Sequence, residues 1–133
     1  GEEILARNVV AASDGAAVLA PPTSIIDLVA LIRTATVMIG GDTGPIHIAS
    51  AVGTPVVGLY GPSDPARNGP WAPADVIVSR YNRCRCQQVR AAVAPAGVVV
   101  RRCCQPNRCL ADISVEEVAS AVEQRLAILS IHA

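Results

Sequence analysis

The sequence predicts an α/β domain in which helices cover both faces of a parallel sheet, giving three Rossmann-like layers. Short runs that are apolar at every position alternate along the chain with segments whose apolar residues recur at helical spacing. A strand that is apolar throughout is buried on both faces, which is typical of parallel sheets with helices above and below. The 133 residues are the size of one domain, and a hydrophobic content of 51% is enough for a core.

The first part of the chain is predicted to run helix, strand, helix. Residues 2–12 have apolar residues at helical spacing behind an acidic first turn. Residues 16–20 (AAVLA) form a short apolar run that we expect to be a buried strand. Two prolines end this run, and Thr23 or Ser24 is then expected to cap a helix over about 25–34.

The second part repeats the alternation and ends in the clearest helix. Ser114 and Glu117 stand at the spacing of a capping box, in which the two side chains and backbone N–H groups bond reciprocally. The apolar face of this last helix consists of Val115, Val118, Ala119, Val122 and Leu126. The other expected elements are strands at 36–40, 55–60 and 75–79 and a short helix from Pro45 to Val52.

The segment Gly40–His47 (GGDTGPIH) is the candidate site, because it follows a predicted strand and opens a predicted helix. Ligands of open parallel sheets bind beyond the carboxyl ends of the strands, and the free N–H groups at a helix start favour phosphate. Asp42, Thr43 and His47 bring polar side chains to this turn. A simpler interpretation stays open, in which Asp42 or Thr43 only caps the helix and His47 is a surface residue. The polar turn Gly61–Pro65, which ends the next strand at the same edge, favours a ligand cleft.

Residues 40–71 (GGDTGPIHIASAVGTPVVGLYGPSDPARNGPW) resemble the signature of glycosyltransferase family 9, the lipopolysaccharide heptosyltransferases. The family pattern is a strand, D-T-G-P-x-H, a short helix, G-T-P, a strand and G-P-T-D-P, from which this sequence departs at Ser63. The closing stretch CLADISVEEV at 109–118 also resembles the family. The resemblance implies the two-domain GT-B architecture, with this chain as part of the carboxy-terminal domain.

The same resemblance implies a binding site for a nucleotide-sugar donor, ADP-heptose, as substrate, and we expect no cofactor. No carboxylate pair suited to a metal is evident in the sequence, so we expect no metal. The implied contacts are the backbone at Thr23 for the base, Asp42 for sugar hydroxyls, Thr43 and Gly44 for the diphosphate, and His47 for the sugar phosphate. An acidic residue that opens the first helix, Glu3 rather than Glu2, would bind the ribose hydroxyls. Complementarity to the helix dipole explains Glu3 equally well.

The implied activity is donor binding within an inverting glycosyltransferase of lipopolysaccharide core synthesis. In this family an amino-terminal domain binds the acceptor, and we expect that the 133 residues without it are inactive. Two alternatives stay open: a non-catalytic nucleotide-binding or interaction domain, and another GT-B nucleotide-sugar enzyme such as an epimerase. The strand at 16–20 would present an open sheet edge, which predicts a homo-oligomer.

The five cysteines fall within an Arg/Cys-rich loop at 80–110, inside the single partial domain 1–133. Their order, C-x-C followed by C-C-x4-C, matches no recognised zinc site. We expect reduced thiols in a compact loop, with a structural metal and disulfides formed in handling as alternatives. A thiol cluster would consist of Cys84, Cys86, Cys103 and Cys109.

Charge is divided along the chain. Residues 76–111 contain seven arginines and no acid, whereas the rest contains four arginines and eleven acids, so a segment of +7 is joined to a body of −7. A solvated loop explains the arginines most simply, and attraction to anionic lipid or to lipopolysaccharide phosphates is the alternative. Only Tyr81 interleaves with them, so we expect no nucleic-acid partner. Because no apolar run approaches the ~18 residues of a membrane span, we expect a cytoplasmic protein with at most peripheral contact to the inner membrane.

Overall fold

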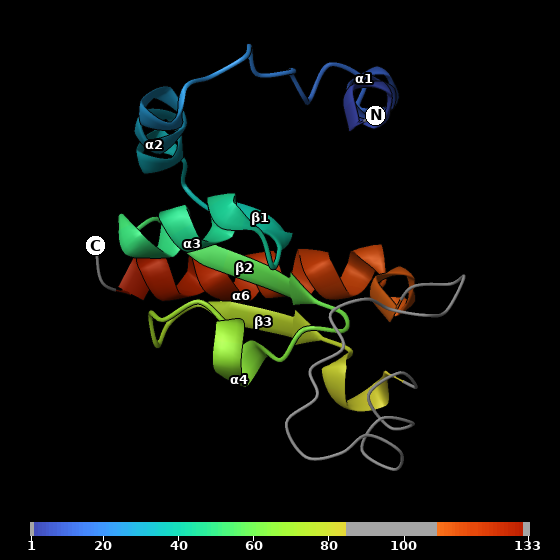
Figure 1. Cartoon of the computed structure of the whole chain (residues 1–133), viewed down its shortest axis with the longest axis vertical. Helices are drawn as coiled ribbons and strands as arrows, with labels where there is room; N and C mark the ends of the chain where they lie inside the picture. The colour runs from blue at the N-terminus through green and yellow to red at the C-terminus, as the bar shows by residue number, and fades with distance from the viewer. Residues whose placement is uncertain (1, 85–108, 132–133) are drawn as a thin grey trace, which may run out of the picture.

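A computed structural model describes residues 2–84 and 109–131 of the chain (Figure 1). Among these residues, no helix combines the length and the apolarity needed to cross a bilayer. The elements, in chain order, are α1 (Glu2–Ala12), α2 (Ile25–Thr34), β1 (Met38–Gly41), α3 (Gly44–Ala51), β2 (Val56–Tyr60), α4 (Pro65–Asn68), β3 (Val76–Ser79), the 3₁₀ turns η1 (Tyr81–Arg83) and η2 (Cys109–Asp112), and α6 (Val115–Ile131).

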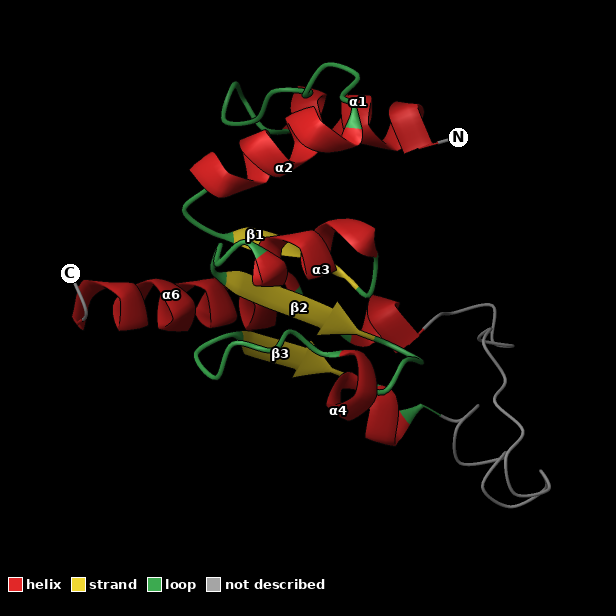
Figure 2. Ribbon diagram, turned by 60° about the vertical axis from the view of Figure 1, so that its left-hand side comes forward, coloured by secondary structure: helices red, strands yellow, loops and turns green. Residues whose placement is uncertain are grey.

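The sheet contains three parallel strands in the order β1-β2-β3, with Met38 opposite Val56 and Val57 opposite Val76. The carboxyl ends of the strands therefore meet at one edge. Helix α3 packs on β1 and β2, and α6 packs on β2 and β3 from the other face (Figures 1 and 2). The prediction of a parallel α/β sheet covered on both faces is confirmed within the described residues.

The core lies around the central strand. Val56, Val57 and Tyr60 of β2 are completely buried, as β-branched and aromatic residues of a strand covered on both faces should be. On the α3 side Val56 joins Ile46, Ala49 and the Ile32 of α2 in one buried cluster. The capping box of α2 forms at Ser24 with Asp27, so Ser24 and not Thr23 is the cap.

Helix α6 is tied to the amino end of the sheet by an ion pair. One oxygen of Asp75 accepts hydrogen bonds from the Nε of Arg125 at 3.2 Å and from the backbone N–H of Val56 at 2.9 Å. The side chains of Asp75 and Arg125 are both buried. The innermost face of α6 therefore contains Arg125 together with Ala121, whereas Val115 of the predicted apolar face is exposed.

The predicted strand at 16–20 is wrong. Residues 17–24 have no regular structure, and the side chain of Val18 is 89% exposed. A strand is stable only beside a hydrogen-bonded neighbour, and the three-stranded sheet of the described residues does not include this segment. The open edge expected at 16–20 is consequently absent. In the described residues, the strand that lies at that side of the sheet is β1.

Candidate functional site

The candidate site lies where β1 ends and α3 begins. Asp42 and Thr43 form the turn between Gly41 and Gly44, at the carboxyl edge of the sheet. A side chain at Gly40 would stand 3.2 Å from the Cγ1 atom of the buried Ile46. Close packing of α3 on β1 thus favours glycine there, because a larger residue would force Ile46 to shift.

The carboxylate of Asp42 is contacted through both of its oxygens. The Nε2 of His47, one turn into α3, lies 3.1 Å from Oδ1, and the Nδ2 of Asn68 donates to Oδ2 at 3.1 Å. The side chain of Asp42 is 20% exposed and that of His47 is 43% exposed. A carboxylate has about four acceptor positions, so two contacts leave others open to a ligand.

Tyr60 connects this site to the core. Its buried hydroxyl donates to the main-chain oxygen of Asn68 at 3.0 Å. Burial and, to a lesser extent, the nearby charge of Asp42 raise the pKa of the Tyr60 phenol. Because its pKa is raised, the phenol stays protonated and can donate this hydrogen bond at neutral pH. The ring of Tyr60 occupies the space beside Gly58, where a Cβ atom would approach the ring to 2.7 Å.

Helix α4, which presents Asn68, is a single turn fixed at both ends. Asp64 caps it by accepting a hydrogen bond from the N–H of Ala66 at 2.9 Å. At the other end the N–H of Gly69 donates to the oxygen of Pro65 at 2.7 Å, and a side chain at Gly69 would collide with that oxygen. The polar turn Gly61–Pro65 therefore contributes to the site mainly by holding this helix.

The start of α3 differs from the starts of three other helices. Thr43 occupies the N-cap position but makes no side-chain capping bond, and its hydroxyl donates instead to the oxygen of Gly41 at 3.3 Å. Thr43 and Gly44 are exposed. By contrast, side chains cap α2, α4 and α6, at Ser24, Asp64 and Ser114. The start of α3 thus presents backbone N–H groups and the positive end of a helix dipole to an external group.

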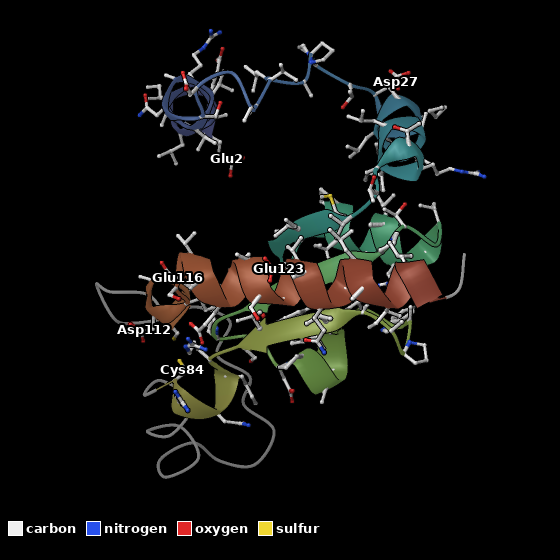
Figure 3. The ribbon with its side chains drawn as sticks, turned by 180° about the vertical axis from the view of Figure 1, so that it is seen from behind. Glu2, Asp27, Cys84, Asp112, Glu116 and Glu123 are labelled. Carbon is white, nitrogen blue, oxygen red and sulfur yellow. The ribbon has the colours of Figure 1, made fainter. Side chains whose placement is uncertain are left out.

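The structure brings together four of the predicted site residues, Asp42, Thr43, Gly44 and His47, and places the other two elsewhere. Glu3 lies on α1, where its exposed carboxylate pairs with Arg7 at 2.7 Å. Helix α1 has no buried residue and stands apart from the sheet, as Glu2 does in Figure 3. Thr23 is exposed and precedes α2. The roles expected for Glu3 and Thr23 remain predictions.

Sequence reasoning did not identify Asn68 and Tyr60. One signal was available for Asn68: the run D-P-A-R-N-G has a capping residue, proline in the first turn and glycine after the last, which predicts one helical turn ending at Asn68. The spacing along the chain does not reveal that this turn faces Asp42, because the two residues are 26 positions apart.

The part of the thiol cluster that lies in the described residues is one buried pair. The sulfur atoms of Cys84 and Cys109 are 2.8 Å apart, and both residues are buried. Cys86, Cys103 and Cys104 lie outside the described residues. Over 2–84 and 109–131, no three His, Cys, Asp or Glu residues are grouped in a way that could hold a metal ion.

Arg80, which follows β3, links the end of this strand to η2 and α6. Its guanidinium donates to the main-chain oxygen of Asp112 at 2.9 Å and to the carboxylate of Glu117. The Arg80 hydrogen bond and, next, the backbone bond at Ser114 lower the pKa of Glu117. Figure 3 shows Cys84 and Asp112 at this end of the molecule. Arg80 is therefore a structural tether and not part of a freely solvated charge.

An apolar groove of about 680 Å³ opens beside β1, on the face of the sheet that α6 covers. Side chains of the predicted apolar face of α6 form one wall, and Glu123 is the one charged residue among the described residues that line the groove. The residues that line the groove include Ile39, Leu59, Leu110, Val115, Val118 and Val122.

The sequence model of glycosyltransferase family 9 (heptosyltransferase) matches residues 1–96, which is most of the chain. The chain belongs to glycosyltransferase family 9. The match includes Asp42, Thr43, Gly44, His47 and Asn68, and it confirms the resemblance drawn from residues 40–71. The closing stretch at 109–118 lies beyond the matched residues.

Individual family 9 proteins resemble shorter parts of the chain. The lipopolysaccharide core heptosyltransferase OpsX of Haemophilus influenzae is 41% identical over 63 residues, which cover 47% of this chain and 18% of that protein. Lipooligosaccharide heptosyltransferase 2 of the same organism is 37% identical over 60 residues, or 45% of this chain and 17% of that protein. Lipopolysaccharide heptosyltransferase 3 of Escherichia coli K12 is 47% identical over 53 residues, which cover 40% of this chain and 15% of that protein. The chain thus matches less than a fifth of each relative's length, and no solved structure matches it.

Proposed function

We propose that this chain is the donor-binding part of an inverting glycosyltransferase of lipopolysaccharide core synthesis, and that its donor is a nucleotide-sugar, ADP-heptose. One observation carries the proposal: the exposed start of α3 has no side-chain cap and stands beside the Asp42–His47 pair. The names of the three relatives support it, because each is called a heptosyltransferase.

The diphosphate of the donor suits the start of α3. Backbone N–H groups at Thr43 and Gly44 and the positive end of the helix dipole attract phosphate oxygens. When an acceptor hydroxyl attacks the anomeric carbon, negative charge grows on the departing nucleoside diphosphate, and the same groups stabilise that charge. Asp42 accepts hydrogen bonds from sugar hydroxyls, and His47 donates to a phosphate oxygen. These groups perform their roles without a metal or a cofactor.

The nucleoside end of the donor is assigned to the segment before β1. In this proposal the backbone at Thr23 borders the base and Glu3 binds the ribose hydroxyls. The present partner of Glu3 is Arg7, in an ion pair whose two side chains are mostly exposed. Exposed pairs of this kind contribute little to stability, so the carboxylate can exchange Arg7 for a diol at small cost.

Transfer to a lipopolysaccharide acceptor is proposed for the whole protein only. The matches cover 15–18% of the relatives, and no described group beside Asp42 is assigned as a catalytic acid or base. We therefore expect the 133 residues to bind donor without turnover. The GT-B architecture, a cytoplasmic location and peripheral contact with the inner membrane belong to the same proposal.

We also propose that the chain forms a homo-oligomer, through the edge strand β1 instead of residues 16–20. The edge strand of the described sheet on the α2 side is β1, and its Ile39 is 44% exposed. An apolar edge strand pairs readily with another strand. Light scattering at high protein concentration should therefore report an oligomer, and a monomer would contradict this part of the proposal.

Calorimetric titration with ADP-heptose, UDP-sugars and GDP-sugars tests the proposal. We expect the chain to bind ADP-heptose most tightly, and Asp42→Ala and His47→Ala each to weaken binding about tenfold, equivalent to about 1.4 kcal/mol. Asp14→Asn, which removes an exposed carboxylate from a turn before α2, is the matched control. Failure of the chain to bind any nucleotide-sugar would sink the proposal and favour an interaction domain.

A further inference from the structure

We propose that Asn68 is a positioning residue for the sugar of the donor. Its side-chain amide holds the carboxylate of Asp42 in the orientation that accepts sugar hydroxyls. The inference rests on the proposed donor-binding role of Asp42 and extends it to a residue outside the D-T-G-P-x-H segment.

Two neighbours on different elements determine how the Asp42 carboxylate is turned. The Nδ2 of Asn68 donates to Oδ2 and the Nε2 of His47 lies against Oδ1, each at 3.1 Å. The terminal torsion of an aspartate is soft, so a carboxylate held by one contact can rotate, whereas two contacts fix its plane. Whether the Nε2 of His47 donates or accepts depends on the tautomer of the imidazole. The Nδ2 of Asn68 can only donate, so it is the neighbour whose bond to the carboxylate has a fixed direction.

Asn68 is itself held independently of its side chain. The buried hydroxyl of Tyr60 donates to its main-chain oxygen, which links Asn68 to the central strand. The cap at Asp64 and the close turn at Gly69 fix the two ends of α4. Because these contacts use backbone atoms of Asn68 and other residues, removal of the amide should leave α4 in place. The structural and positioning roles of Asn68 can therefore be separated by mutation.

The test compares two probes, ADP-heptose and ADP, in calorimetric titrations of the full 133-residue chain. Asp42 is assigned to the sugar and the α3 start to the diphosphate, so loss of the amide should affect only the probe that contains the sugar. We expect Asn68→Ala to lower the affinity for ADP-heptose about tenfold and the affinity for ADP less than twofold. Asn8→Ala, at an exposed position of α1, is the matched control and should change neither affinity.

A double-mutant cycle shows whether Asn68 acts through Asp42. If it does, adding Asn68→Ala to Asp42→Ala should cause no further loss of ADP-heptose affinity. Additive losses, or an equal weakening of ADP and ADP-heptose by Asn68→Ala, would overturn the inference while the proposed function stands. If the wild-type chain binds neither probe, both the proposed function and this inference fail.

An NMR measurement without ligand tests the contact between Asn68 and Asp42 even if Asn68→Ala folds poorly. In ¹⁵N-labelled wild-type protein, the side-chain amide signal of Asn68 should be displaced from that of a solvated asparagine and should move in Asp42→Ala. A signal at the solvated position that is the same in both proteins would contradict the inference. Thermal melting of Asn68→Ala, expected within a few degrees of wild type, confirms that α4 remains folded.

Discussion

At the scale of single residues, the neighbours of Asp42 show which parts of the site could be predicted from sequence and which could not. Asp42, Thr43, Gly44 and His47 lie within one strand-to-helix turn, so local spacing alone brings them together. Asn68 reaches the same carboxylate from α4, 26 positions further along the chain, and that depends on tertiary packing. Interpretation of Thr43 as a helix cap was also resolved only by the structure, in which its hydroxyl bonds to Gly41 instead.

Tyr60→Phe tests the connection between the core and the site. Phenylalanine fills the same space but leaves the main-chain oxygen of Asn68 without its donor. We expect the free energy of unfolding to fall by about 1 kcal/mol at neutral pH, measured by urea denaturation.

The pH dependence of stability gives Tyr60→Phe a second readout. Burial and the charge of Asp42 raise the pKa of Tyr60 in the folded protein. The folded state therefore keeps the phenolic proton to higher pH than the unfolded chain, whose tyrosines titrate near about 10. The free energy of unfolding of the wild type should decline as the pH rises above about 10, and that of Tyr60→Phe should decline less steeply. Identical slopes, with Tyr81→Phe as a control for loss of a phenol, would contradict this assignment.

At the scale of elements, helix-capping residues predicted secondary structure more reliably than apolar runs did. The capping box predicted for α6 forms, and the cap predicted for α2 at Thr23 or Ser24 is Ser24. The run at 16–20 is apolar, but a strand also needs a neighbour, and sequence periodicity carries no information on neighbours. The most buried described residues of α6 are Ala121 and Arg125, which lie outside the predicted apolar face, and Arg125 pairs there with the buried Asp75.

Glu117→Gln tests the contact between β3 and α6. The hydrogen bond from Arg80 and the backbone bond at Ser114 lower the pKa of Glu117, so the folded state binds this proton more weakly than the unfolded chain does. The stabilisation is present above the unfolded value of about 4.3 and is lost as the pH falls through the lower folded value.

The melting temperature is the measurement for this element. Glu117→Gln should melt below wild type at pH 7, and the gap should close as the pH is lowered below about 4. Glu123→Gln, on the same helix, controls for loss of a negative charge from α6. A gap that is constant between pH 7 and pH 3 would show that the Glu117 carboxylate does not contribute through its charge.

At the scale of the whole molecule, the fold class was predictable and the arrangement of its parts was not. Continuous apolar runs at β1, β2 and β3 indicate a sheet buried on both faces, and the structure has one. Helix α1 has no buried residue and stands apart from the sheet, so the structure does not bring Glu3 to the turn at Asp42, and the roles of Glu3 and Thr23 remain proposals. Among the described residues, an ion pair between Arg80 and Glu117 joins the basic segment to the acidic body.

The site as a whole is therefore an uncapped helix start with a carboxylate oriented from two sides. The helix start is a property of one turn, whereas the orientation of Asp42 requires β1, α3 and α4 in their folded positions. Binding of the sugar should consequently depend on the folded domain more strongly than binding of the diphosphate.

The most direct test of the account is to locate the bound donor by ¹H–¹⁵N chemical-shift mapping with ADP-heptose. We predict that the largest shifts occur at the backbone amides of Thr43 and Gly44 and at the side chain of Asn68. Shifts concentrated in the apolar groove, at Val118 and Val122 of α6, or the absence of shifts at a millimolar concentration of ADP-heptose, would contradict donor binding at the start of α3.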